Sequence, residues 1–249
     1  MNVSDVFASG TQVVSEGKLI KEQKRLAPPG HFLETVIVPE ITEEDLAIRV
    51  DGPAAVSEVK CRVISYPDTN RLPTQFSELV LPVVHGEVIP ENYQGEEAPL
   101  NYIAVFHRHG KNNNRSVGIL NGYGITAGAV VTTIAHDSHH LAVLGTNKKD
   151  MALAANRARE IQGGIVAAKD GEIVAELHLP LAGLMSLDTA HEFGPKLNEF
   201  ISVLQSTVLP RQHPIMRLVG VTLPVIPHAK ITDLGYVYVD TQELLPLFV

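Results

Sequence analysis

Apolar residues along this chain fall mostly into short runs that glycine, proline or asparagine interrupt, a pattern typical of β-strands. Between residues 46 and 145 these runs are rich in β-branched side chains, which favour extended backbone. The strands predicted there are 46–50, 59–64, 79–82, 102–106, 116–120, 129–134 and 141–144. Farther along, 165–168 and 172–177 form a predicted hairpin, and 217–225 and 235–239 return to strand.

Two segments instead repeat their apolar residues every three or four positions, which is the period of an amphipathic helix. In the first segment, Asn147 can cap a helix that Gly163-Gly164 ends. The second segment begins near residue 188, but Gly194-Pro195 interrupts its apolar face, so we predict a regular helix only from Pro195 onward. The predicted fold class is therefore α+β, with mixed, mainly antiparallel sheets and at least two packed helices.

The N-terminal segment differs from this pattern. Residues 3–7 and 12–14 flank a Ser9-Gly10 turn and predict a β-hairpin within residues 1–21. A connector that contains Pro28-Pro29-Gly30 and several acidic residues follows the hairpin. We therefore predict a hairpin with its linker over residues 1–29 and one larger domain over residues 30–249.

Composition and charge narrow the functional classes. The formal net charge of −8 argues against a nucleic-acid partner, because phosphate binding depends on clustered positive charge. Cys61 is the only cysteine, which excludes an internal disulfide and fits a reducing compartment. With no apolar run of about 18 residues and no signal peptide, we expect a cytoplasmic protein without a membrane span. The 11 histidines are unusual because several are clustered, and imidazole titrates near neutral pH and binds metals.

The richest cluster is Ala135-His136-Asp137-Ser138-His139-His140, directly after an apolar run. His136, Asp137, Ser138 and His139 are candidates for acid–base chemistry, and the two histidines are also candidate metal ligands. On an extended backbone His136 and Ser138 would face one way, and Asp137 and His139 the other. The alternative is a polar strand end that only holds a neighbouring loop.

A second cluster, His107-Arg108-His109, ends another predicted strand. His107 and His109 would share one face of that strand and could bind one metal ion, or could simply begin an exposed loop. Arg108 would point the other way, where its guanidinium could bind a carboxylate or phosphate of a substrate. Arg108 and His109 are the candidate substrate-binding residues.

Eight motifs taken in order closely resemble the C-terminal domain of adenine deaminases of the amidohydrolase superfamily. They are GITAGA at 124–129, AHDSH at 135–139, GTN at 145–147, DMA at 150–152, GG at 163–164, LPLAGLMS at 179–186, LPVIP at 223–227 and LFV at 247–249. FASG at 7–10 and EGKL at 16–19 are similar to the last hairpin of the small β domain that flanks the catalytic barrel in that family. Three departures are His107, where the family tends to have an acidic residue, His140, where asparagine is more usual, and Lys148, which replaces another common asparagine or aspartate.

The resemblance implies hydrolysis of adenine to hypoxanthine and ammonia by a metal-activated hydroxide. The implied manganese or iron would be held by a (β/α)₈ barrel expected before residue 1, so no metal ligand of the family is expected in this chain. The implied partners are that barrel, in the same longer protein or a separate subunit, and adenine. A homo-oligomer is also expected, and the apolar segment 244–249 would dock on another surface, in cis or in trans.

Three functional hypotheses remain open. The chain could be the C-terminal portion of an adenine deaminase-like enzyme, with its histidine-rich segment capping or completing the purine pocket of the barrel. It could instead be a non-catalytic purine-binding or assembly module. The third hypothesis is a self-contained metal-dependent hydrolase that uses His107, His109, His136, Asp137 and His139.

Overall fold

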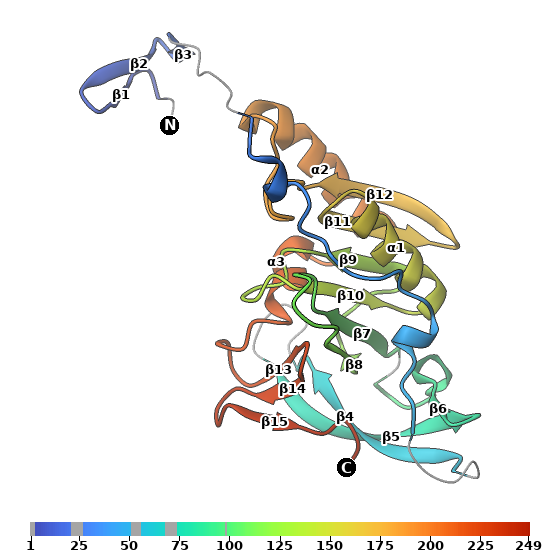
Figure 1. Cartoon of the computed structure of the whole chain (residues 1–249). Helices are drawn as coiled ribbons and strands as arrows, with labels where there is room; N and C mark the ends of the chain where they lie inside the picture. The colour runs from blue at the N-terminus through green and yellow to red at the C-terminus, as the bar shows by residue number, and fades with distance from the viewer. Residues whose placement is uncertain (1–2, 21–26, 51–55, 68–73, 98) are drawn as a thin grey trace.

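The computed structural model describes residues 3–20, 27–50, 56–67, 74–97 and 99–249. In the first of these ranges, β1 (Val6–Ala8), β2 (Thr11–Ser15) and β3 (Lys18–Leu19) pair antiparallel in that order. The predicted N-terminal hairpin is therefore confirmed, and a third short strand extends it. Figure 1 shows this small sheet standing apart from the rest of the molecule.

A nine-stranded sheet forms the centre of the larger unit, in the order β12-β11-β9-β10-β7-β8-β4-β5-β6. Neighbouring strands are antiparallel except β4 and β8, which are parallel. This mixed, mainly antiparallel sheet confirms the predicted fold class. Its strands are β4 (Glu58–Ser65), β5 (Gln75–Val84), β6 (Glu87–Val88), β7 (Asn101–Phe106), β8 (Arg115–Asn121), β9 (Ala129–Thr132), β10 (Leu141–Gly145), β11 (Gly164–Lys169) and β12 (Glu172–His178).

Both faces of the central strands are covered. Helix α1 (Lys148–Glu160) packs on one face through Met151 and three alanines, while α2 (Ala190–Thr207) and α3 (Pro214–Gly220) contribute to the core on the other face (Figure 1). Every residue of β7, β9 and β10 is buried. This explains why these strands are almost continuously apolar instead of alternating.

A second three-stranded antiparallel sheet completes the covered face. It consists of β13 (Ala229–Thr232), β14 (Gly235–Tyr238) and β15 (Glu243–Leu245). Tyr236 anchors this sheet to β8, because its hydroxyl accepts a hydrogen bond from the backbone N–H of Ile119 at 2.7 Å. The C-terminal tail then runs beside β4, where Arg62 N–H donates to Leu247 O at 2.7 Å. The apolar tail therefore docks in cis.

The two predicted helices are present, with one correction. The Asn147 side chain caps α1 by accepting from Asp150 N–H at 2.8 Å. Helix α2, however, begins at Ala190 and contains Pro195, so the prediction of a regular helix only from Pro195 onward is wrong. The physical reason is the capping box that Thr189 and Glu192 form at the start of α2, which satisfies backbone donors upstream of the proline.

Two strand predictions are also wrong. The segment 217–225 overlaps α3, which Pro214 begins at its first position, where a missing N–H costs no helical hydrogen bond. The segment 46–50 follows a 3₁₀ turn (Glu44–Leu46) and forms only an isolated bridge between Arg49 and Glu87. Its apolar residues instead pack into the core. Two further 3₁₀ turns span Gly30–Phe32 and Pro90–Asn92.

A close backbone approach joins the end of α1 to the segment after β12. At Gly163, where φ is +119°, an added Cβ would lie 2.4 Å from the Cα of Gly183. Gly183 itself lies against the guanidinium of Arg108, which a Cβ at Gly183 would approach to 3.0 Å. Because these two positions are glycines, the segment after β12 packs directly against Arg108. Arg108 in turn supports the candidate site.

Candidate functional site

The segment after β9 is a turn over residues 136–139 and does not continue the strand. His139 N–H donates to Ala135 O at 2.8 Å, and His139 has a φ of 54°. The prediction that side chains alternate between two faces is therefore wrong, because that alternation applies only to extended backbone. The turn instead brings the rings of His136 and His139 together, with their centroids 5.3 Å apart.

Three side chains from two distant segments, 108–109 and 222, hold the backbone of this turn from behind. The bonds run from Arg108 Nε to His139 O at 2.6 Å, between His109 Nε2 and Ser138 O at 2.9 Å, and from Thr222 Oγ1 to His136 O at 2.9 Å. With three of its carbonyls bound in this way, the turn is fixed relative to the sheet before any ligand arrives.

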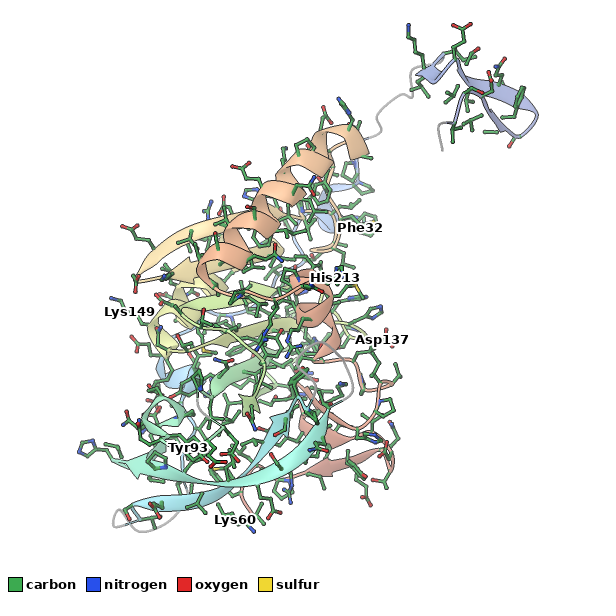
Figure 2. The ribbon with its side chains drawn as sticks, turned by 180° about the vertical axis from the view of Figure 1, so that it is seen from behind. Phe32, Lys60, Tyr93, Asp137, Lys149 and His213 are labelled. Atoms are coloured by element: carbon green, nitrogen blue, oxygen red, sulfur yellow. The ribbon has the colours of Figure 1, made fainter. Side chains whose placement is uncertain are left out.

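The side chains of the turn point outward. His136 Nδ1 lies 2.8 Å from Asp137 Oδ1, and these side chains are 49% and 61% exposed. Figure 2 shows Asp137 at the margin of the molecule. His139 is bound to its own loop, with Nδ1 2.8 Å from Ile134 O. An imidazole paired with a carboxylate can hold or move a proton, so His136 and Asp137 are suited to acid–base work.

Arg108 lies inside the protein, with 1% of its surface exposed. Besides His139 O, its guanidinium donates to the backbone carbonyls of Thr35 and Ala182, both at 2.9 Å. Burial lowers the pKa of Arg108 to about 10, which still leaves the guanidinium charged near neutral pH. The substrate contact predicted for Arg108 stays a prediction, while its contacts in this chain bind four chain segments together.

The second histidine cluster involves more residues than the sequence indicates. The rings of His107, His109 and His140 surround one point, with centroid separations of 5.4, 4.7 and 5.3 Å. Asp233, from the turn between β13 and β14, completes the group: its Oδ1 lies 3.2 Å from His140 Nε2, and its Oδ2 lies 3.6 Å from His107 Nδ1. Two of the three positions at which the sequence departs from the resembling family, 107 and 140, are thus in contact, while Lys148 pairs with Glu87.

Burial sets the charge state of this cluster. Desolvation lowers the pKa of His140, although the carboxylate of Asp233 acts in the opposite direction. Desolvation also lowers the pKa of His109. Both imidazoles therefore favour the neutral form near pH 7, which is the form that binds metals.

The structure separates the predicted metal candidates. Among the described residues, ligand atoms that lie within 4.8 Å of one another come from His107, His140 and Asp233. His109, His136 and His139, the other predicted candidates, do not join that group. Sequence reasoning did not select His140 as a metal ligand. It also missed Asp233, because a single aspartate in a turn far along the chain carries no local signal.

Other features fit structural roles. Cys61 is completely buried, and burial raises the pKa of its thiol to about 12, as expected for an unreactive core residue. A cavity of about 530 Å³ lies between β12 and α2, lined by apolar residues together with the Lys196–Asp188 ion pair. No helix within the described ranges is long and apolar enough to cross a membrane.

Comparison with known proteins places these features in a family. Residues 71–243 match the family model of the adenine deaminase C-terminal domain. An adenine deaminase of Cereibacter sphaeroides (strain ATCC 17025 / ATH 2.4.3) is 43% identical over 179 residues, which cover 67% of this chain and 32% of the relative. Adenine deaminase 2 of Shouchella clausii is 36% identical over 221 residues, or 89% of this chain and 37% of the relative. An adenine deaminase of Brucella abortus (strain 2308) is 36% identical over 247 residues, which cover 97% of this chain and 39% of the relative. The chain thus spans between 32% and 39% of the length of these relatives.

Proposed function

This chain belongs to the family of adenine deaminase C-terminal domains, and from that premise we propose that it is the C-terminal portion of an adenine deaminase-like enzyme. The proposed reaction is adenine plus water to hypoxanthine plus ammonia. The relatives that carry this name are much longer than the segment that they share with this chain. That difference supports a catalytic barrel supplied elsewhere, in the same longer protein or as a separate subunit.

The observation that carries the proposal is the contrast between the two sides of the turn over 136–139. Its backbone is held by Arg108, His109 and Thr222, while the side chains of His136 and Asp137 extend into solvent. A rigid scaffold that presents polar groups on a loop is the usual construction of a binding or catalytic site. The proposed role of this turn is to cap or complete the purine pocket of the barrel.

The proposed roles of the residues in this chain are to transfer protons and to orient the reacting groups. His136 is placed to accept or donate a proton at a ring nitrogen, and Asp137 Oδ1, 2.8 Å from His136 Nδ1, would fix the orientation of that ring. Ser138 could add a hydroxyl that binds the purine. A manganese or iron ion in the barrel would supply an activated water. His107, His140 and Asp233 come from the ends of antiparallel strands and not from a barrel, so no step of the reaction is assigned to them.

The test uses the enzyme that contains both the barrel and this chain. We expect His136→Ala and Asp137→Asn each to lower kcat at least about tenfold, since positioned acid–base groups contribute 10²–10⁴-fold, and to leave the metal content of the barrel unchanged. The matched control is His85→Asn, which changes an exposed histidine in the turn after β5. Normal turnover in both variants, or loss of the barrel metal, would contradict the proposed role of this turn.

The alternatives have distinct signatures. A purine-binding module would give saturable heat on titration of this chain with adenine, with no ammonia released in any combination with a barrel. A self-contained hydrolase would release ammonia from adenine without a barrel. Either result would replace the deaminase proposal.

Location and assembly complete the proposal. The proposed compartment is the cytoplasm, and the buried, unpaired Cys61 supports it because reducing compartments favour free thiols. The metal-dependent enzyme would act in purine salvage as a homo-oligomer. Neither nucleic acid nor a membrane is proposed as a partner, in keeping with the net charge of −8.

A further inference from the structure

Two largely buried histidines have ring nitrogens without hydrogen-bond partners among the described residues. Both ring nitrogens of His107 and Nδ1 of His140 are buried atoms, and none of them makes a hydrogen bond within the described ranges. A buried polar atom without a partner is destabilising, and most buried polar groups in proteins are satisfied. A ligand beside His107 Nδ1, the nitrogen that faces Asp233, would satisfy one of these atoms.

The third member of the group supplies negative charge. The Asp233 carboxylate faces both rings, and the side chains of His107, His140 and Asp233 are only 9%, 7% and 13% exposed. Asn114 Nδ2 donates to Asp233 Oδ2 at 3.3 Å and so orients the carboxylate. Carboxylates that bind metals are themselves commonly held by such hydrogen bonds.

The distances suit a small transition-metal ion. A tetrahedral zinc ion with bonds of about 2.1 Å separates its ligand atoms by roughly 3.4 Å. The two nitrogen-to-oxygen separations here are 3.2 and 3.6 Å, and one ligand atom from each of the three residues lies within 4.8 Å of the others. These two separations bracket the tetrahedral value.

The geometry points to a divalent transition-metal site formed by His107, His140 and Asp233, for which zinc is the best-matched ion. Imidazole nitrogens favour zinc and its neighbours over magnesium and calcium, which prefer oxygen ligands. The test of this site involves neither adenine nor the barrel. Failure of one proposal therefore leaves the other intact.

The position of the three ligands gives the site a structural consequence. His107 follows β7, His140 precedes β10, and Asp233 lies at the tip of the β13–β14 hairpin. A bound ion would join the small C-terminal sheet to the central sheet, and it would also anchor the chain immediately after the turn over 136–139. Binding to the folded state alone would then raise the temperature of unfolding.

The experiment titrates Zn²⁺ into the metal-free 249-residue chain by calorimetry and measures retained metal by plasma emission after gel filtration. We expect one zinc per chain, a raised temperature of unfolding, and no saturable heat with Mg²⁺. Asp233→Asn and His140→Asn should each weaken zinc binding at least about tenfold. His136→Ala, which alters the neighbouring exposed turn, should bind zinc like the unchanged chain.

A second measurement keeps the site testable if a variant fails to fold. Side-chain ¹H–¹⁵N spectra of the unchanged protein should show zinc shifting the ring nitrogens of His107 and His140, with a smaller effect at His136 and His139. The proposal is overturned by a chain that takes up no zinc. It is also overturned by zinc binding whose affinity is unchanged in Asp233→Asn, or by zinc shifts confined to His136 and His139.

Discussion

Replacement of Arg108 by methionine tests how the exposed turn is held in place. Arg108 donates to the carbonyls of His139, Thr35 and Ala182 at 2.6, 2.9 and 2.9 Å, and all of these lie around a side chain that is 1% exposed. Each buried carbonyl that loses its donor costs about 1–3 kcal/mol, so three of them cost roughly 3–9 kcal/mol. Removal of a buried charge recovers part of that cost.

We therefore expect Arg108→Met to lower the free energy of unfolding by about 3–5 kcal/mol. For a chain of this size, that loss corresponds to a melting temperature lower by roughly 10 °C. Urea denaturation followed by circular dichroism measures it. Arg108→Lys should recover only part of the stability, because one ammonium group cannot reproduce a planar fork of donors.

Arg49→Met is the matched control. Arg49 is 48% exposed and pairs with Glu44, which is 66% exposed, and its second partner Glu87 keeps Lys148. Because water screens the exposed pair, the loss of Arg49 should leave the urea midpoint nearly unchanged. If Arg108→Met unfolds at the same urea concentration as the control, the guanidinium does not hold the turn and the argument for a fixed site fails.

Three further predictions concern packing and pH. Gly163→Ala should lower the free energy of unfolding by about 2–4 kcal/mol, because its Cβ would lie 2.4 Å from the Cα of Gly183; an unchanged urea midpoint would contradict this. Hydrogen bonding by Arg157 lowers the pKa of Glu176 from 4.5 to about 2, so the pair stabilises the fold above pH 4.5 and loses that effect as pH falls toward 2. The side chains of Arg157 and Glu176 are 35% and 28% exposed, so water screens the pair. We expect the free energy of unfolding of Glu176→Gln to be about 1 kcal/mol below that of the unchanged chain at pH 6, and this difference should shrink at pH 3. A difference that does not change with pH would refute the prediction. Burial lowers the pKa of Lys230 from 10.5 to about 8, so between these pH values the unfolded state binds more protons than the folded state. The free energy of unfolding should therefore rise between pH 8 and 10.5. Denaturation at pH 8 and pH 10 checks this, and the rise should be absent in Lys230→Met.

Local sequence signals predicted much of the fold because they report local physics. The continuous apolar runs of β7, β9 and β10 correspond to strands buried on both faces. Asn147 indicated the start of α1, and its side chain accepts the expected backbone hydrogen bond. These features depend on neighbours within a few residues, so the sequence alone is sufficient to find them.

The errors occur where distant contacts decide the structure. Pro195 indicated a helix start, but a capping box a turn earlier allows α2 to begin before it. The segment 46–50 has strand-like spacing because Leu46 and Ile48 are buried in the core, although it forms no extended ladder.

The sequence was sufficient to find most residues of the candidate site. It was not sufficient to predict how their side chains are arranged. The histidine-rich segments marked the right region, since His109 and Arg108 bind the turn that contains Ser138 and His139. The backbone reversal at the turn changed which side chains are neighbours. The contribution of Asp233 depends on where the β13–β14 hairpin packs, which no local pattern reveals.

The central claim is that this chain completes a deaminase whose catalytic metal lies in a separate barrel. The most direct measurement compares ammonia release from adenine by the purified 249-residue chain, by the barrel-bearing polypeptide, and by the two co-purified, with bound metal measured in each. The account predicts turnover only for the combination. Turnover by the 249-residue chain alone, or a barrel equally active without this chain, would contradict it.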